Sequence, residues 1–420
     1  MTFAGKHCAI AFLQFLNLIS PVVLVRFGYY RSFRIGSMVG DTDVVLARCE
    51  SEGRSGFFRN INIFISEVPE SKSANKFVTI LWRRSGVKIL RYSKQALHFW
   101  FLLNDKAAIE PKLSKHLING VVKPKSRILD DRDLNCLTEN TQPRICLSSK
   151  ERASGLKWLA QLGISPDAKI ALLLGRDPIY GTARGDNPSF HSHRNMNINS
   201  FDLAALELVK NGYYVFRMGS MVKDAFKVAD EKHIFDYALN GMRTEFLDVF
   251  LASMCELIVS VSSGYDALPL AFRKPIVYVN YPVLGTAPLF RRNSLILCKI
   301  IKDKLTHKTL TIRELYERDI LFEFDSEAFD KANCYFVDNT NVEICNSVGE
   351  MLGFLKDKSL LTEVEDSYQS LLFRELAEVY VNAPEDLKCP SRAKYSTWGL
   401  LSGHYGILPA GLADVTQIEG

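Results

Sequence analysis

The sequence predicts an α/β protein made of two doubly wound domains that face a cleft. The first observation is length, because 420 residues exceed what one ordinary hydrophobic core encloses and suit two domains. The second is that short apolar runs alternate with amphipathic ones, which is typical of parallel strands joined by helical crossovers. The third is a polar, broken segment at residues 124–143, after which the alternation starts again. We therefore expect domains at 1–140 and 141–385 and a separate tail at 386–420.

The first expected element is a helix that ends at Ser20. The apolar run at residues 8–27 is interrupted by Pro21, so it falls short of the roughly 20 apolar residues that a membrane-spanning helix needs. No small-residue cleavage site follows it. Further along the first domain, the hydrophobic period predicts helices at 73–85 and 93–104 and strands at 21–27, 41–48, 61–68 and 86–91.

The second domain repeats the pattern in the same order. The helix at 200–212 ends at Gly212, a residue that favours the position after a helix. The other expected helices are 151–164, 244–255, 338–359 and 359–381. The expected strands are 168–175, 213–219, 256–264 and 274–282.

Composition narrows the class of protein. The formal net charge is +5, with 47% hydrophobic and 24% charged residues, so the chain is globular and only mildly basic. Such a charge suits anionic small molecules or an acidic surface and does not require nucleic acid, which we exclude as a partner. The nine cysteines are odd in number and lack zinc-ligand spacing, which favours a reducing compartment. We expect a cytoplasmic protein.

Several common enzyme classes lack their motifs here. The chain has no glycine-rich loop of the dinucleotide-binding or P-loop type in a strand-to-helix setting. It also lacks the nucleophile elbow of the α/β-hydrolases. Acidic residues do not cluster with metal-ligand spacing. We therefore expect no cofactor and no bound metal.

Polar residues follow the expected strand at 168–175. In open α/β sheets ligands bind outside the carboxyl ends of the strands, and Arg176, Asp177 and Tyr180 stand there. Arginine offers a planar fork for phosphate or carboxylate. Asp177 is either a general base or the partner of an arginine, and the loop is either a ligand loop or a solvated connection.

The segment His191–Asn195 reads HSHRN and precedes a helix expected to begin near Asn199 or Ser200. Residues just before a helix lie at its positive end, where anions bind. His191, Arg194 and Asn195 are therefore candidates for anion binding, although a set of surface residues remains the alternative.

Two further strand ends carry polar residues. Arg217 ends an apolar strand and is followed by Gly219, which permits close backbone approach. A charged side chain at this place either reaches solvent or has a partner or ligand.

The strand at 256–264 runs into a small-residue turn. Ser262, Ser263 and Gly264 can form a backbone cradle for an anion, with Asp266 beside it. Asn280 ends the next strand, so we expect it close by.

Taken together these motifs resemble a family of bacterial glycosyltransferases with the two-domain, Rossmann-like GT-B architecture, linked to surface polysaccharide or lipopolysaccharide synthesis. The resemblance covers most of residues 20–360 and departs at Ser37, where the family often has histidine. It is carried by RIGSMVGDTD (34–43), HSHRN (191–195), NGYYVFRMGS (211–220) and SVSSGYDALPLAFRKPIVYVN (260–280), and also by INIFISEVPESKSANK (61–76), GRDPIY (175–180), FDYA (235–238) and FVDNTNVEI (336–344).

The resemblance implies metal-independent transfer of a sugar from a nucleotide-sugar donor to a glycan or lipid-linked acceptor. The donor would bind in the second domain, where Asp177, with His191 second, is the expected general base. The residues expected to bind the donor are Arg176, Tyr180, Arg194, Asn195, Arg217, Gly219, Ser262, Ser263, Gly264, Asp266 and Asn280. Arg34, Gly36 and Asp41 belong to the acceptor side.

Other readings stay open at this point. One is a nucleotide-sugar epimerase or hydrolase of the same fold, because architecture does not fix chemistry. Another is a non-catalytic subunit that binds nucleotide or glycan. The apolar first helix and nearby arginines also leave open a peripheral contact with the inner face of the membrane.

Overall fold

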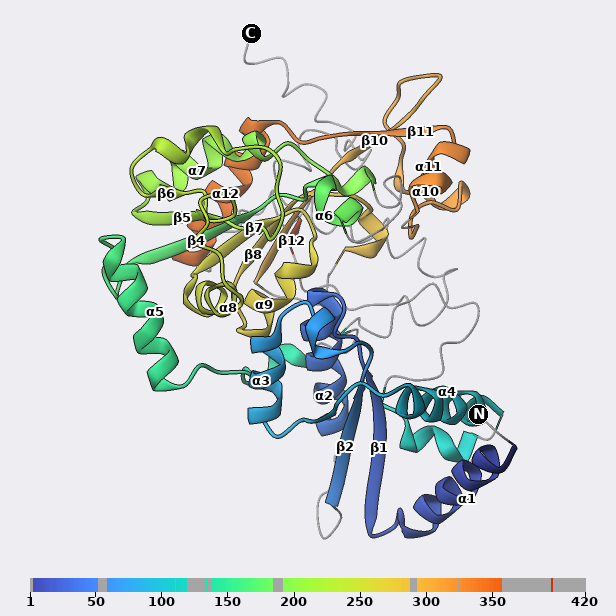
Figure 1. The fold of residues 1–420 in the computed structure, drawn as a ribbon. Coiled ribbons are helices and arrows are strands. Elements are labelled where there is room, and N and C mark those ends of the chain that lie inside the picture. The colour runs from blue at the N-terminus through green and yellow to red at the C-terminus, as the bar shows by residue number, and fades with distance from the viewer. Residues whose placement is uncertain are drawn as a thin grey trace. The chain divides into compact units, whose positions relative to one another are not determined.

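The computed structural model describes residues 3–51, 59–109, 111–118, 133, 137–183, 192–287, 293–323, 325–356 and 394–395. It confirms the α/β class, since strands and helices alternate along the chain and the strands form mainly parallel sheets (Figure 1). The chain forms two compact units. Unit 1 comprises Met1–Arg152, Glu245–Ser253 and Ala267–Arg273, and unit 2 comprises Ala153–Thr244, Met254–Asp266 and Lys274–Gly420. Both units are discontinuous in sequence, whereas the sequence suggested the continuous ranges 1–140 and 141–385.

Unit 1 is built on a three-stranded parallel sheet in the order β1 (Val23–Tyr30), β2 (Arg59–Ser66) and β3 (Lys88–Leu90). Its helices are α1 (Phe3–Ile19), α2 (Thr42–Ser51), α3 (Lys76–Arg84) and α4 (Lys94–Ile109). One hydrophobic cluster joins α1, β1 and α4 through Leu13, Phe27 and Trp100. The expected strands at 21–27, 61–68 and 86–91 are confirmed.

The prediction of a strand at 41–48 is wrong. A π-helical turn, Ser37–Asp41, leads into helix α2 instead. Val44, Val45 and Ala47 are all buried there. A short apolar run with several adjacent buried residues has no clear period, so the sequence pattern cannot separate a helix from a strand.

Helices α8 (Glu245–Met254) and α9 (Ala267–Ala271) lie largely in unit 1 although they come from the second half of the chain. Two hydrogen bonds help to hold them in unit 1. The side chain of Asn75 donates to the carbonyl of Glu245 at 3.0 Å. Arg273, just after α9, donates to Asp43 at 2.7 Å.

Unit 2 is built on a seven-stranded parallel sheet in the order β12-β9-β8-β7-β4-β5-β6. Its chain starts at β4, moves outward through β5 and β6, and then returns to β7 on the other side of β4. This reversal is the topological switch point of a doubly wound sheet, and it lies between β4 and β7. The strands are β4 (Lys169–Leu174), β5 (Tyr213–Arg217), β6 (Ile234–Phe235), β7 (Leu257–Ser260), β8 (Ile276–Tyr281), β9 (Ser294–Cys298) and β12 (Lys394–Tyr395).

The helices of unit 2 complete the layers around this sheet. α7 (Asp202–Lys210) and α12 (Asn341–Lys356) lie side by side (Figure 1) and bury Leu208 and Val348 in one core with the sheet. α5 (Ser149–Gln161) begins in unit 1, and α6 (Pro178–Ala183) follows β4. A small antiparallel pair, β10 (Ile300–Asp303) and β11 (Cys334–Val337), accompanies α10 (Ile312–Glu317) and α11 (Ser326–Lys331).

The C-terminal predictions fall mainly outside the described residues. This holds for the helix expected at 359–381 and for most of the tail expected at 386–420. The exception is β12 (Lys394–Tyr395), which adds a parallel strand beside β9. Within the described ranges, none of the helices combines the length and apolar character needed to cross a bilayer.

Candidate functional site

The carboxyl edge of the seven-stranded sheet gathers most of the candidate donor-binding residues. Ser260 at the end of β7 pairs with Leu174 at the end of β4. Gly175–Asp177 and Val261–Ser263 therefore leave the sheet next to one another, at the switch point between β4 and β7.

A short segment, Ser192–Met196, crosses this edge and touches several strand ends. The guanidinium of Arg194 donates to the carbonyl of Ser262. The amide of Met196 donates to the carbonyl of Arg176 at 3.3 Å. The carbonyl of Asn195 accepts from the Lys299 ammonium at 3.1 Å. One arginine is thus held directly against the turn after β7.

The turn after β7 is shaped by backbone strain and by a buried carboxyl. Ser262 adopts a φ of 63°, a left-handed conformation that is uncommon outside glycine and clusters at functional sites. The amide of Ser263 donates to Asp266 at 2.7 Å, and the hydroxyl of Ser260 donates to it at 2.5 Å. The cradle expected at 262–264 is therefore partly used internally, through the Ser263 amide. Ser262 and Ser263 are half-buried and Gly264 is exposed.

Asp266 is a support for the turn and not a ligand group, because it is 4% exposed. Burial raises its pKa to about 7, although the bonds from Ser260 and Ser263 and the charge of Arg194 act in the opposite direction. Its proton is therefore held more tightly in the folded chain than in the unfolded one.

This proton predicts a pH dependence of stability. Because the folded pKa is raised, the stabilisation from the protonated carboxyl is lost as the pH rises from about 4 through about 7, on the order of a few kcal/mol in total. Asp266→Asn should flatten this part of the curve of unfolding free energy against pH, measured by urea titration. An identical slope in the wild type and the variant would contradict the assignment.

Arg217 does not lie where a ligand could reach it. It is 2% exposed, and its guanidinium donates to both oxygens of Asp236 at 2.9 and 3.2 Å. Asp236 also accepts from the amide of Phe226 at 3.0 Å. Arg217 therefore ties β5 to the segment around β6, and we remove it from the groups that contact a donor.

Asn280 and Gly219 also have structural roles. Asn280 is fully buried and exchanges hydrogen bonds with Asn339, whose amide donates to its Oδ1 at 2.6 Å. A Cβ on Gly219 would lie 2.7 Å from Val222 Cγ1, so only glycine fits there. Both residues therefore help to fix the strand ends.

Asp177 is partly exposed at the end of β4, and two backbone amides hold it. Ile179 donates to one oxygen at 3.0 Å and Lys223 to the other at 2.7 Å. Each carboxylate oxygen has a second acceptor site, so the group can accept a further hydrogen bond. Tyr180 lies in α6, and His191 lies outside the described residues.

Lys299 is a site residue that sequence reasoning missed. It follows β9, is 4% exposed, and pairs with Asp338 at 2.6 Å in addition to its contact with Asn195. Burial lowers its pKa while Asp338 opposes this. The sequence did contain a signal for this residue. The apolar run SLILC predicts a short strand, and the lysine that follows it places a charge at the end of that strand.

The acceptor-side residues lie at the carboxyl edge of the other sheet. Asp41 is buried and pairs with Arg31 at 3.2 Å, Arg34 is exposed, and Gly36 precedes the π-helical turn. A pocket of about 370 Å³ lies at this edge. Its polar lining includes Ser32, Ser66, Arg83, Arg91 and Tyr92.

No group of three or more metal-ligating side chains lies together within the described parts of the chain.

No protein-family model matches the sequence, and no curated protein matches it. One similar solved structure is the ADP-heptose LPS heptosyltransferase II of E. coli, with 13% identity, a TM-score of 0.43 and a match over 79% of this chain and 100% of that one. Another is a family 9 glycosyl transferase from Veillonella parvula DSM 2008, with 9% identity, a TM-score of 0.42 and a match over 79% of this chain and 98% of that one. A UDP-GlcNAc 2-epimerase from Neisseria meningitidis bound to UDP-GlcNAc is also similar, with 13% identity, a TM-score of 0.28 and a match over 79% of this chain and 99% of that one. Similarity at this level carries no argument about the reaction.

Proposed function

We propose that the protein is a metal-independent glycosyltransferase that moves a sugar from a nucleotide-sugar donor to a glycan or lipid-linked acceptor. The observation that carries the proposal is the switch point between β4 and β7, where Arg194 is held on the turn at Ser262. A doubly wound sheet binds nucleotides at this place. Surface polysaccharide synthesis is the process that we propose for it.

The proposed donor site supplies positive charge where the leaving diphosphate develops negative charge. Arg194 and Arg176 offer guanidinium groups, and the Ser262 and Ser263 hydroxyls offer further donors. Asp177 is the proposed general base, and His191 remains the second choice. Arg217, Asp266 and Asn280 position the strand ends, and Lys299 orients the Asn195 backbone.

Arg194→Ala tests this donor site. A charge-assisted hydrogen bond is worth about 1.5–3 kcal/mol, so the variant should bind a nucleoside diphosphate at least about tenfold more weakly. Isothermal titration calorimetry with UDP, GDP, CDP and ADP measures the effect. Arg313→Ala, in an exposed arginine of α10, is the matched control and should bind as the wild type does. Equal affinity in Arg194→Ala would contradict the proposal.

An acceptor-free assay tests the class of reaction. A transferase should leave most of the donor intact until an acceptor is added, whereas an epimerase or hydrolase converts it alone. Complete conversion without acceptor would replace the proposal by the epimerase or hydrolase alternative.

For the lipid-linked acceptor we propose contact between α1 and an anionic membrane. Phe15, Leu18 and Val22 are 55%, 77% and 65% exposed, and α1 contains lysine and histidine but no acidic residue. Apolar side chains together with positive charge bind the interface of an anionic bilayer.

Phe15→Glu combined with Leu18→Glu should abolish flotation with vesicles that contain phosphatidylglycerol. Leu305→Glu, at an exposed leucine of unit 2, is the control and should still float. Flotation of the double variant at the wild-type level would remove α1 as the contact.

A further inference from the structure

A pocket of about 460 Å³ in unit 1 lies at the opposite edge of its sheet from the proposed acceptor site. It is formed where β2 and β3 begin, beside helix α2. A cavity of this size suits a small metabolite. The lining residues are Leu46, Glu50, Ile61, Asn62, Ser85, Gly86, Val87, Lys88 and Arg144.

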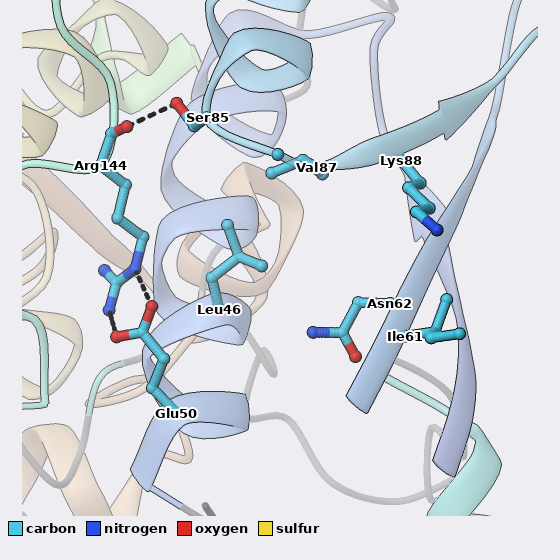
Figure 2. Close-up of a pocket in the computed structure, with 9 residues that line it drawn as sticks. Leu46, Glu50, Ile61, Asn62, Ser85, Val87, Lys88 and Arg144 are labelled. Carbon is cyan, nitrogen blue, oxygen red and sulfur yellow. Dashed lines mark hydrogen bonds and ion pairs between the residues drawn. The ribbon is translucent and has the colours of Figure 1, made fainter. Parts of the chain in front are cut away.

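The pocket has a polar group on each side and an apolar middle. Figure 2 shows Arg144 and Glu50 together on one side, and Asn62 and Lys88 on the other. Leu46 lies between the two sides. A ligand that fills the pocket would therefore present polar ends and an uncharged body.

The Arg144 side holds a carboxylate already. Glu50 accepts two bonds from Arg144, at 3.0 Å from Nε and 2.6 Å from Nη2. This is the two-pronged geometry in which arginine recognises carboxylate and phosphate. The Glu50 side chain is 60% exposed, whereas that of Arg144 is 10% exposed. An exposed carboxylate is therefore bound to a largely buried guanidinium.

Arg144 is held in place by contacts other than the one with Glu50. Its Nη1 donates to the buried carboxylate of Asp43 at 2.7 Å, and its carbonyl accepts from the exposed Ser85 hydroxyl at 2.5 Å. The ion pair with Asp43 keeps the guanidinium in place when Glu50 leaves. Because the Glu50 side chain is 60% exposed, its carboxylate returns to water when the acidic group of a ligand takes its place on Arg144.

We propose that this pocket binds a small dianion with an acidic group, carboxylate or phosphate, at each end of an uncharged body. One acidic group replaces Glu50 on Arg144, and the other pairs with the Lys88 ammonium and the Asn62 amide. The site is separate from the proposed donor and acceptor sites and does not depend on them.

A chain-length series of dicarboxylates tests the proposal in the full-length protein. Succinate, adipate and suberate are titrated by calorimetry against hexanoate, which has only one acidic end. The best dicarboxylate should bind at least about tenfold more tightly than hexanoate. Lys88→Gln should remove this preference, and Lys94→Gln, an exposed lysine of α4 outside the pocket, should keep it.

A second variant separates binding from folding. Glu50→Gln removes the competing carboxylate, so every acid should bind more tightly, by about threefold or more. Phenyl phosphate and benzoate then show whether phosphate or carboxylate is preferred at Arg144. Hexanoate binding as well as the best dicarboxylate, a preference that survives Lys88→Gln, or unchanged affinity in Glu50→Gln would each overturn the proposal.

Discussion

Replacing Asp177 by asparagine is expected to lower the rate of sugar transfer by about 10²–10⁴-fold, the usual contribution of a general base. Asparagine has nearly the same size and keeps an oxygen that can accept from the Ile179 amide, but it cannot take a proton. The dissociation constant for the nucleotide should change by less than about threefold, because Arg176 and Arg194, and not Asp177, are the proposed diphosphate contacts. Initial rates and calorimetric binding measure the two quantities.

The control must separate proton transfer from loop anchoring. Asp177 accepts from the Lys223 amide at 2.7 Å, and Asn199 accepts in the same manner from the Lys227 amide at 2.9 Å. Asn199→Ala should therefore lose a similar anchor and a similar amount of stability while keeping its activity. Transfer by Asp177→Asn within twofold of the wild type would show that Asp177 only caps α6.

Asp43→Ala is expected to lower the free energy of unfolding by about 3–5 kcal/mol, the cost of removing one partner from a buried ion pair. The Asp43 carboxylate lies 2.7 Å from both Arg144 and Arg273 and its side chain is 4% exposed. Its loss leaves two guanidinium groups without their shared partner, so that Arg273 keeps only its bonds to carbonyl and hydroxyl oxygens such as those of Thr141. Urea denaturation followed by circular dichroism measures the effect.

An exposed ion pair provides the comparison for Asp43. Asp330 pairs with Lys304 at 2.8 Å, but its side chain is 74% exposed, so Asp330→Ala should cost less than about 1 kcal/mol. A similarly small cost for Asp43→Ala would mean that the pair does not hold the discontinuous parts of unit 1 together.

The sequence was sufficient for the parallel sheets because buried strands and amphipathic helices leave a local pattern. The strands that contain Phe64, Leu172 and Val259 were all predicted, and their core side chains are buried. The pattern failed at Val44 and Val45, where adjacent buried residues of a short helix show no clear period. It also missed β9, which is short and follows a charged segment.

The candidate residues lie at strand ends, as the sequence predicted, but the role of each side chain depends on distant partners. Arg217 is paired with Asp236 and Asn280 with Asn339. These partners are 19 and 59 residues away, and no local spacing predicts them. Residues that are exposed at the carboxyl edge of the sheet and residues that are buried beneath it therefore cannot be told apart in the sequence. Burial separates Arg217, Asp266 and Asn280 from the partly exposed Arg194 and Ser262.

The most direct test of the central claim is a crystal structure of the protein with a bound nucleoside diphosphate. The account predicts diphosphate oxygens within about 3 Å of the Arg194 guanidinium and the Ser263 hydroxyl, at the edge between β4 and β7. A diphosphate bound elsewhere, with Arg194 still on the Ser262 carbonyl and no ligand beside it, would contradict it.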